Sequence, residues 1–342
     1  MTGSPPLVSI IIPVHNSRAH IPALLERLTQ QVQDRDEILL VDDASTDDGT
    51  PLLEAFVAAH PQARLIRLDS PHGVARARNA ALKLAHGQYV WFADDDDLWA
   101  PHILDVLLEA ATRSDADVVV CQAELRHPGH QSGAIIDGTD HELIISRERA
   151  WTLVLEGAMQ GYLWNKLIRR STLGTDPFTD MSSQSDFTGV VRALANSDCV
   201  HLIPAVLYFH LVREGSITRR KTPNLANLER AHDLAIELIP GEEATGLTGS
   251  MNYFRAWFLV LPLAHTPTRV RAPWSIRRDG LRRAREAAQH LDMVELHVRS
   301  RRIHHQVWLV TRLGTVYLLA LHAAQVLKRL DRRIRSDARR GA

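Results

Sequence analysis

Short apolar runs alternate with segments of helical periodicity over the first 125 residues. The apolar runs are rich in valine, isoleucine and leucine and have the length of buried strands; they lie at 7–14, 36–45, 63–69, 88–94 and 116–125. The segments between them repeat apolar residues at the spacing of an amphipathic helix. This alternation predicts an α/β domain, doubly wound, with a mostly parallel sheet.

The pattern changes after residue 125. Residues 126–142 are typical of a loop, helical patterns follow at 147–158 and 185–197, and "CVHLIPAVLYFHL" (199–211) predicts a pair of strands around Pro204. Beyond about Lys221 the strand signals end, and helices are expected around 224–239, 250–263, 275–291 and 303–336. We therefore expect one domain over 1–220, with halves at about 1–125 and 126–220, and a helical region over 221–342.

The charge of the chain is unevenly distributed although the net charge is zero. Of the 342 residues, 45% are hydrophobic and 23% charged, as in ordinary globular proteins. From His265 to the end there are 18 Lys and Arg against 6 Asp and Glu, so the rest of the chain is acidic. An acidic front part favours a cation or sugar site over nucleic-acid binding, and a basic end favours an anionic partner.

The C-terminal segment carries two open interpretations. Leu313–Leu327 is too short and too polar to span a bilayer, and Lys328–Arg340 is rich in arginine. The segment is either a helix packed on the domain or across a homo-oligomer, or a peripheral membrane contact at the inner face of the membrane. Its basic end, Lys328–Arg340, would attract either anionic lipid or a polyanionic acceptor. Two cysteines and an N-terminus without a charged leader lead us to expect a cytoplasmic location.

Polar residues follow three of the predicted strands. His15 and Asn16 follow the first strand, Asp43 the second, and the four aspartates of "YVWFADDDDLWAP" the fourth. Because parallel strands end at one edge of the sheet, these side chains are expected at one ligand-binding edge. Two unit charges ~5 Å apart repel by roughly 3 kcal/mol at an effective dielectric of about 20, so the aspartates favour a divalent cation. The alternative is an N-cap cluster for the helix at 101–113.

Six motifs then resemble a known family in their order and spacing over residues 7–219. They are "VSIIIPVHN", "ILLVDDASTDDGT", "GVARARNAAL", "GQYVWFADDDDLW", "WNKLIRRS" and "REGSIT". The chain resembles the inverting family 2 glycosyltransferases of GT-A fold. The resemblance implies an enzyme that moves a sugar from a nucleotide-diphosphate sugar donor, UDP-linked, to a glycan or cell-envelope polymer acceptor, with Mn²⁺ or Mg²⁺ as cofactor.

The resemblance assigns roles to the acids. Asp94 takes the position that faces the ribose, and Asp96 the position that meets the metal. Asp95 supports the donor side, and Asp97 orients its neighbours or helps with metal or acceptor. Asp43 matches the acid that accepts the imide N–H of uracil.

Further donor contacts follow from the same resemblance. Pro13, His15 and Asn16 match a segment that contacts the base, with His15 where the family usually has a stacking tyrosine. Arg78 matches an arginine close to the diphosphate, whose planar donors suit phosphate. The remaining diphosphate and lid contacts are Lys166, Arg213 and Ser216.

The general base is expected at the start of the helix near residue 185. The family has a Glu-Asp pair there, whereas this chain has Ser185 followed by Asp186, which we assign as the base. Asp186 could instead cap its helix, and Asp180 is then the second candidate. Trp164 is either the floor of the sugar site or a core residue.

Two other functions compete with glycosyl transfer. Ser185 in place of glutamate would suit a protein that binds nucleotide sugars without turnover. The stretch "EILLVDD" followed by "WFAD" mimics a receiver-like signalling domain, but a strand-helix unit precedes it here, which such a domain lacks. No G-x-S-x-G, P-loop or H-E-x-x-H motif occurs in the chain.

Overall fold

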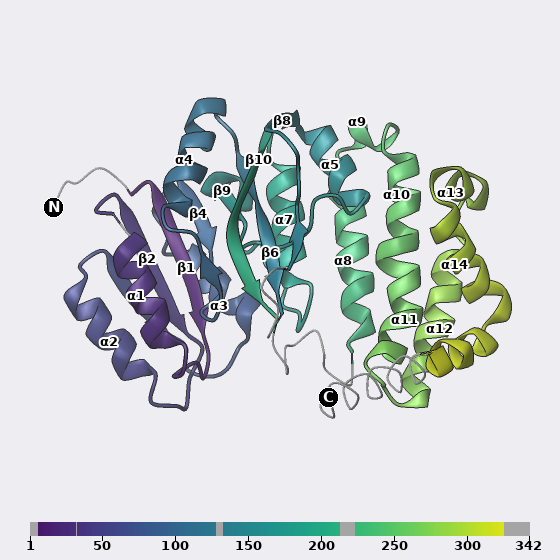
Figure 1. Cartoon of the computed structure of the whole chain (residues 1–342), viewed down its shortest axis with the longest axis horizontal. Helices are drawn as coiled ribbons and strands as arrows, with labels where there is room; N and C mark the ends of the chain where they lie inside the picture. The colour runs from purple at the N-terminus through teal and green to yellow at the C-terminus, as the bar shows by residue number, and fades with distance from the viewer. Residues whose placement is uncertain (1–5, 32, 128–132, 213–222, 325–342) are drawn as a thin grey trace, which may run out of the picture. The chain divides into compact units, whose positions relative to one another are not determined.

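The computed structural model describes residues 6–31, 33–127, 133–212 and 223–324. The chain forms two compact units, Met1–Arg213 with Glu237–Glu243, and Glu214–Ile236 with Ala244–Ala342. The first contains the sheet and the second is helical (Figure 1). Within the described residues, no helix is both long enough and apolar enough to cross a membrane.

One mixed sheet organises the first unit, with strand order β3-β2-β1-β4-β9-β6-β10-β5 and with β7 on β6 and β8 on β10. Its strands are β1 (Val8–Val14), β2 (Asp36–Asp42), β3 (Ala63–Arg67), β4 (Tyr89–Phe92), β5 (Leu98–Trp99), β6 (Val118–Arg126), β7 (Ala134–Ile136), β8 (Leu143–Ser146), β9 (Lys166–Arg169) and β10 (Cys199–Leu211). Every residue of β2 and β4 is buried, as expected for strands covered on both faces.

Strands β1 to β4 form the parallel sheet that the sequence pattern predicts, whereas the rest of the sheet is mixed. Strands β1 to β4 pair only in parallel among themselves, whereas β9 runs antiparallel between β4 and β6. The predicted pair of strands around Pro204 is wrong: β10 is one strand, parallel to β6, with register shifts between Ile203 and Tyr208. Pro204 is exposed where the register shifts, because a residue without an N–H cannot continue the ladder.

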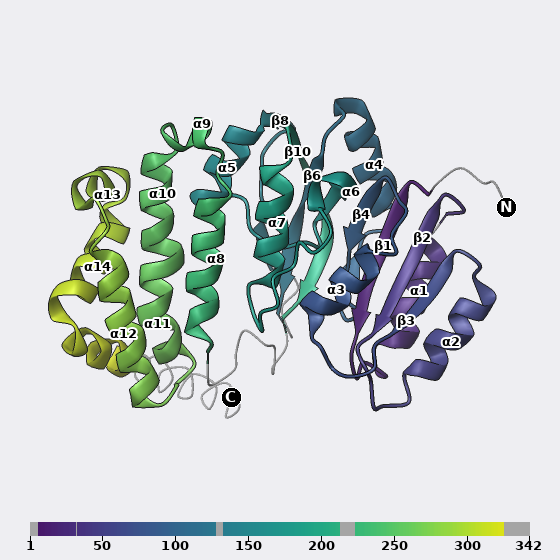
Figure 2. The same ribbon diagram turned by 180° about the vertical axis from the view of Figure 1, so that it is seen from behind.

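Helices cover both faces of this sheet. In the first unit they are α1 (Ile21–Gln31), α2 (Thr50–Ala59), α3 (Val74–Leu82), α4 (Ile103–Ser114), α5 (Arg147–Leu155), α6 (Arg170–Leu173), α7 (Ser185–Ala195) and α9 (Gly241–Ala244). Helices α1, α2 and α4 share one apolar cluster with alternate residues of β1, β2 and β4 (Figure 1). Helices α3 and α7 lie on the opposite face (Figure 2).

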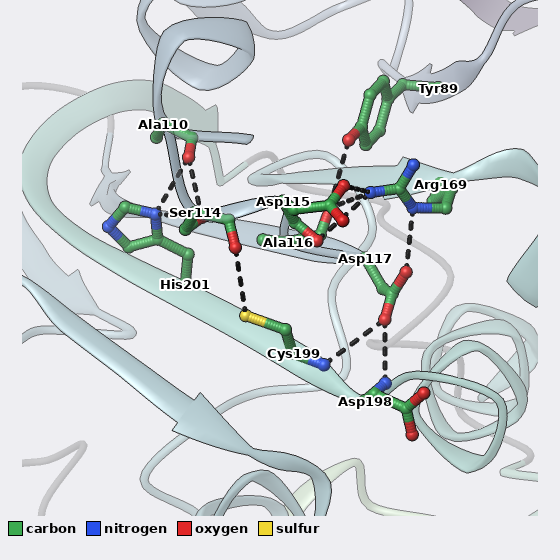
Figure 3. A network of polar contacts seen from close by, with 10 residues as sticks. All are labelled: Tyr89, Ala110, Ser114, Asp115, Ala116, Asp117, Arg169, Asp198, Cys199 and His201. Atoms are coloured by element: carbon green, nitrogen blue, oxygen red, sulfur yellow. Dashed lines mark hydrogen bonds and ion pairs between the residues drawn. The ribbon is translucent and has the colours of Figure 1, made fainter. Parts of the chain in front are cut away.

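A polar network fixes the edge where the parallel strands begin (Figure 3). Arg169, at the end of β9, donates from Nε to Asp117 Oδ1 at 2.8 Å and from Nη2 to Asp115 Oδ1 at 2.6 Å. Asp117 Oδ2 accepts the N–H groups of Asp198 at 2.8 Å and Cys199 at 3.3 Å. The network joins the starts of β6 and β10 to β9, which leaves the opposite edge for ligands.

The second unit is a helical bundle. Its helices are α8 (Leu225–Glu237), α10 (Thr248–Phe254), α11 (Leu261–Arg269), α12 (Trp274–Ala288), α13 (Met293–Arg299) and α14 (Arg301–Leu313), with a π-helical segment, Arg255–Val260, between α10 and α11. Its core includes Leu259, Leu263, Leu281 and Val307. The helical C-terminal region is thus confirmed, although the segment expected as one helix from 303 is interrupted at Gly314, where φ is 52°.

His232, on α8, gives the second unit a predicted sensitivity to acid. The side chain is 1% exposed and stacks on Phe254 at 5.4 Å, and its Nε2 has no hydrogen-bond partner among the described residues. Burial lowers the pKa of His232, although Asp233 opposes this. Because the unfolded chain binds the proton more readily, the free energy of unfolding should fall as the pH drops below about 6.5.

The variant His232→Phe keeps the stacked ring and removes the titrating group. We expect the difference in unfolding free energy between variant and wild type to grow in favour of the variant between pH 7 and pH 5. Urea denaturation at both pH values measures this difference. A difference that does not change with pH would show that His232 is not held neutral.

Candidate active site

A buried arginine joins two carboxylates at the carboxyl edge of the sheet. Arg78 of α3 donates from Nη2 to Asp94 Oδ1 at 2.9 Å, and from Nη1 to Asp186 Oδ1 at 2.6 Å. The Arg78 side chain is 2% exposed, and each carboxylate is 29% exposed. Asp94 lies two residues after the end of β4, and Asp186 lies in the first turn of α7, so one guanidinium links a strand end to a helix start.

The local sequence explains why Arg78 points inward. Helix α3 begins after Gly73, whose φ of 85° suits glycine, and it buries Ala75, Ala77 and Arg78. Burial would lower the pKa of Arg78, but Asp186 and Asp94 outweigh burial and raise it, so the guanidinium stays charged. Both Nη groups of Arg78 bind carboxylates in this structure. The predicted contact of Arg78 with the diphosphate stays a prediction.

Asp94 is under a strongly negative field. Burial is the largest influence on this carboxyl, and Asp97, Asp186 and Asp96 add to it. Arg78 opposes them but does not prevail, and the pKa of Asp94 is raised to about 7. The edge thus holds more negative charge than its own arginine neutralises, which is the electrostatic condition for a bound cation.

Asp97 is fully buried and positions the end of β10. Its Oδ2 accepts hydrogen bonds from Tyr208 Oη at 3.0 Å and His210 Nδ1 at 2.9 Å, and its Oδ1 accepts the N–H of Leu211 at 2.8 Å. Tyr208 Oη also accepts the N–H of Asp94 at 3.2 Å. Asp97 thus links three groups at the end of β10, and its role in donor, metal or acceptor binding stays a prediction.

Asp94, Asp97 and His210 form a candidate metal centre. One ligand atom from each lies within 4.8 Å of the other two. Burial disfavours the charged imidazole of His210, but the hydrogen bond to Asp97 and the charges of Asp97, Asp94 and Asp96 outweigh it and raise the pKa of His210. The sequence-based assignment missed His210 and Tyr208; the polar residues within the apolar run "VLYFHL" were the available signal.

Trp164 supports this centre from the core. Its side chain is 2% exposed and stacks on Tyr208 at 4.6 Å, on Tyr162 at 4.8 Å and on His210 at 5.5 Å. This burial agrees with the core alternative, and a role of Trp164 as the floor of a sugar site stays a prediction. Its stacking fixes the ring plane of His210.

The residues predicted to contact the nucleotide meet at the ends of β1 and β2. Both carboxylate oxygens of Asp43 accept backbone N–H groups, of His72 and Gly73, each at 2.7 Å. His15 is exposed, and its Nδ1 is hydrogen-bonded to the carbonyl oxygen of Asp43 at 2.7 Å. Asn16 is also exposed and has a φ of 53°, while Pro13 is half-buried. Contacts of these side chains with a base stay predictions.

Two of the predicted site residues form ion pairs of their own. Lys166 is 0% exposed and its Nζ forms a buried ion pair with Asp137 Oδ2 at 2.9 Å, and its contact with a diphosphate stays a prediction. Asp180 forms an exposed pair with Arg76 at 2.6 Å. Asp95 and Asp96 are half-buried beside Asp94. The last two predicted donor contacts lie outside the described residues; they are Arg213 and Ser216.

Comparisons with known proteins agree with this architecture. The model of the family "Glycosyl transferase family 2" matches residues 9–171. EpsH of Bacillus subtilis (strain 168) is 27% identical over 222 residues, which are 63% of this chain and 63% of EpsH. The glycosyltransferase GlyG of Streptococcus pneumoniae serotype 4 is 30% identical over 114 residues, 33% of this chain and 38% of GlyG. The chain thus spans less than two thirds of either relative.

A solved structure extends the likeness of the fold. S. aureus TarS, residues 1–349 in complex with UDP-GlcNAc, superposes with a TM-score of 0.65 over 89% of this chain and 90% of that chain, at 16% identity. At that identity the likeness shows the fold alone. Taken with the arrangement of the sheet, it shows that this chain has the GT-A fold, within which residues 9–171 are similar to glycosyl transferase family 2.

Proposed function

We propose that this protein is an inverting glycosyltransferase that moves a sugar from a UDP-linked donor to a glycan or cell-envelope polymer, with a divalent metal bound at the site. The observation that carries the proposal is the buried Arg78, which holds Asp94 and Asp186 in one constellation. Asp94 belongs to the candidate metal centre, and Asp186 is the predicted base. The carboxylate proposed to act at the donor, Asp94, and the carboxylate proposed to remove the acceptor proton, Asp186, are thus bound to the same arginine.

The residues at the candidate metal centre fit Mn²⁺ or Mg²⁺. Carboxylate oxygens are the ligands that both ions prefer, and the raised pKa of Asp94 reflects the negative charge that an ion would offset. His210 is bound through Nδ1 to Asp97, which leaves Nε2 for a metal, an arrangement common in metal-binding histidines. When bound, the ion would offset the charge that develops on the leaving nucleotide. Asp96 as a ligand stays a prediction.

The donor would lie between His15 and Asp94. His15 and Asn16 are exposed at the end of β1, beside the backbone of Asp43, where a base can stack on the imidazole. The bound UDP-GlcNAc of S. aureus TarS supports a UDP-linked donor for this chain as well. The acceptor class follows from the family resemblance. A cytoplasmic location stays a prediction. So does a membrane contact through Lys328–Arg340, because residues 325–342 lie outside the described residues.

Asp186 has the geometry of a general base. Its Oδ1 accepts hydrogen bonds from Arg78 and, at 3.3 Å, from Ser185 Oγ. Its Oδ2 has no hydrogen-bond partner in the part of the chain that the structure describes. That oxygen is free to take the proton of an acceptor hydroxyl as the hydroxyl oxygen attacks the anomeric carbon.

The proposal is tested by incubating the chain with a panel of UDP-sugars and envelope glycans, with Mn²⁺ or with EDTA. We expect release of UDP and a product whose anomeric configuration, measured by NMR, is opposite to that of the donor. Retained configuration would contradict the inverting mechanism. Donor binding without transfer to any acceptor would instead favour a nucleotide-sugar-binding protein, to which Ser185 in place of glutamate is suited.

The metal requirement gives a separate prediction. We expect EDTA to lower transfer by roughly 100-fold or more, since charge offset by a metal is worth several kcal/mol. The variant His210→Ala should raise the Mn²⁺ concentration that gives half-maximal transfer, because one of the proposed ligands is lost. His102→Ala, which changes an exposed histidine on the same unit, is the control and should not shift it. Full activity in EDTA would contradict the assignment.

A further inference from the structure

The second unit contains a groove that the proposed transfer does not use. The groove has a volume of about 710 Å³ and lies between α12 and α14. Three arginines of α12 line it, Arg278, Arg282 and Arg285, together with Arg312 of α14. The α12 arginines are spaced i, i+4 and i+7, so they share one face of the helix and extend over about 10 Å.

Most of this positive charge is not neutralised by the protein. Arg282 pairs with Asp279 at 2.7 Å and with Glu286 at 2.8 Å. Arg278, Arg285 and Arg312 are exposed and form no ion pair or side-chain hydrogen bond with any residue that the structure describes. Three planar guanidiniums thus face one concavity with their donors available, and such donors suit carboxylates and phosphates.

An aromatic ring completes the groove. Trp308 of α14 lines it and is 42% exposed, while Leu281 and Ala288 are buried beneath. A half-exposed indole offers a flat apolar face with a polar edge, a surface on which the C–H face of a sugar ring can stack. The combination of a stacking ring with arginines at regular spacing is suited to sugar units that carry acidic groups.

We propose that the groove between α12 and α14 is a binding site for an acidic glycan, a polymer whose sugars carry carboxylate or phosphate groups. An extended chain can follow the ladder of arginines while one sugar stacks on Trp308. A flat lipid surface fits less well, because the exposed apolar residues nearest in sequence do not line the groove; they are Leu313, Val316 and Leu319. Binding of an acidic glycan to this groove does not require sugar transfer at the candidate active site, so the two proposals can fail independently.

Affinity gel electrophoresis of the full chain tests this site. Polygalacturonate and polyphosphate serve as acidic probes, dextran as the neutral one, and phosphatidylglycerol vesicles are tested separately by flotation. We expect retardation by polygalacturonate and not by dextran, weakening as salt is raised. Binding to polyphosphate without binding to polygalacturonate would show that the site recognises charge and not sugar, and would overturn the glycan assignment. Binding to the vesicles without binding to polygalacturonate would overturn it as well.

Two matched triple variants localise the binding. The variant Arg278→Gln/Arg285→Gln/Arg312→Gln should weaken polygalacturonate binding roughly tenfold or more, and Trp308→Ala should weaken it several-fold. The control removes the same charge from exposed arginines outside the groove, with the changes Arg230→Gln, Arg301→Gln and Arg302→Gln. The control should bind within about twofold of wild type. An equal loss in both triple variants, or no binding by wild type, would overturn the proposal.

Discussion

Replacing Asp186 by asparagine is expected to lower the rate of sugar transfer by roughly 10²- to 10⁴-fold. The amide oxygen of asparagine can still accept the hydrogen bond that Arg78 donates at 2.6 Å, so the start of α7 should keep its position. The amide cannot take a proton from an acceptor hydroxyl. Donor affinity should therefore change little, and the loss should lie in kcat.

Asp180→Asn is the matched control for this variant. Asp180 is the other carboxylate considered as a base, and it forms an exposed pair with Arg76. Its replacement should leave kcat within about twofold, because an exposed pair contributes little. A large loss in Asp180→Asn together with normal transfer in Asp186→Asn would refute the assignment of the base.

The variant Arg78→Met is expected to lower the free energy of unfolding by about 3–5 kcal/mol. Arg78 is the buried cation between Asp94 and Asp186, and its removal leaves two carboxylates without their shared partner. Methionine has a similar length, so most of the loss should be electrostatic. Because the pKa of Asp94 should then rise further, the destabilisation should be smaller at pH 5 than at pH 8.

Arg76→Met gives the comparison two residues earlier on the same helix. Arg76 and its partner Asp180 are 55% and 57% exposed, so its loss should cost no more than about 1 kcal/mol. Urea denaturation of both variants gives the two values. Equal destabilisation by Arg78→Met and Arg76→Met would show that the link between Asp94 and Asp186 does not hold the site together.

Much of the fold and the position of the site follow from local sequence. The apolar runs that become β1, β2 and β4 are continuous and end in polar residues, so they predict both buried parallel strands and a common ligand edge. Asp94 was proposed as a site residue from this pattern, whereas Asp186 was assigned from the family resemblance.

The partners of these residues depend on contacts distant in sequence. Nothing within α3 shows that Arg78 would meet Asp186, which is 108 residues away. Asp97 meets Tyr208 and His210 only because β10 pairs with β5. Lys166 looked available to a ligand, but the antiparallel β9 buries it against Asp137. Such pairings are set by the packing of the sheet and leave no local pattern.

Thermal unfolding of the chain with a panel of nucleotide sugars, in Mn²⁺ and in EDTA, tests the central claim most directly. A ligand that binds only the native state at 100 times its Kd stabilises it by about 2.7 kcal/mol, which is a measurable rise in Tm. We expect at least one UDP-sugar to raise Tm in Mn²⁺, and to raise it less in EDTA. If no nucleotide sugar raises Tm in the presence of the metal, the proposed donor site is wrong.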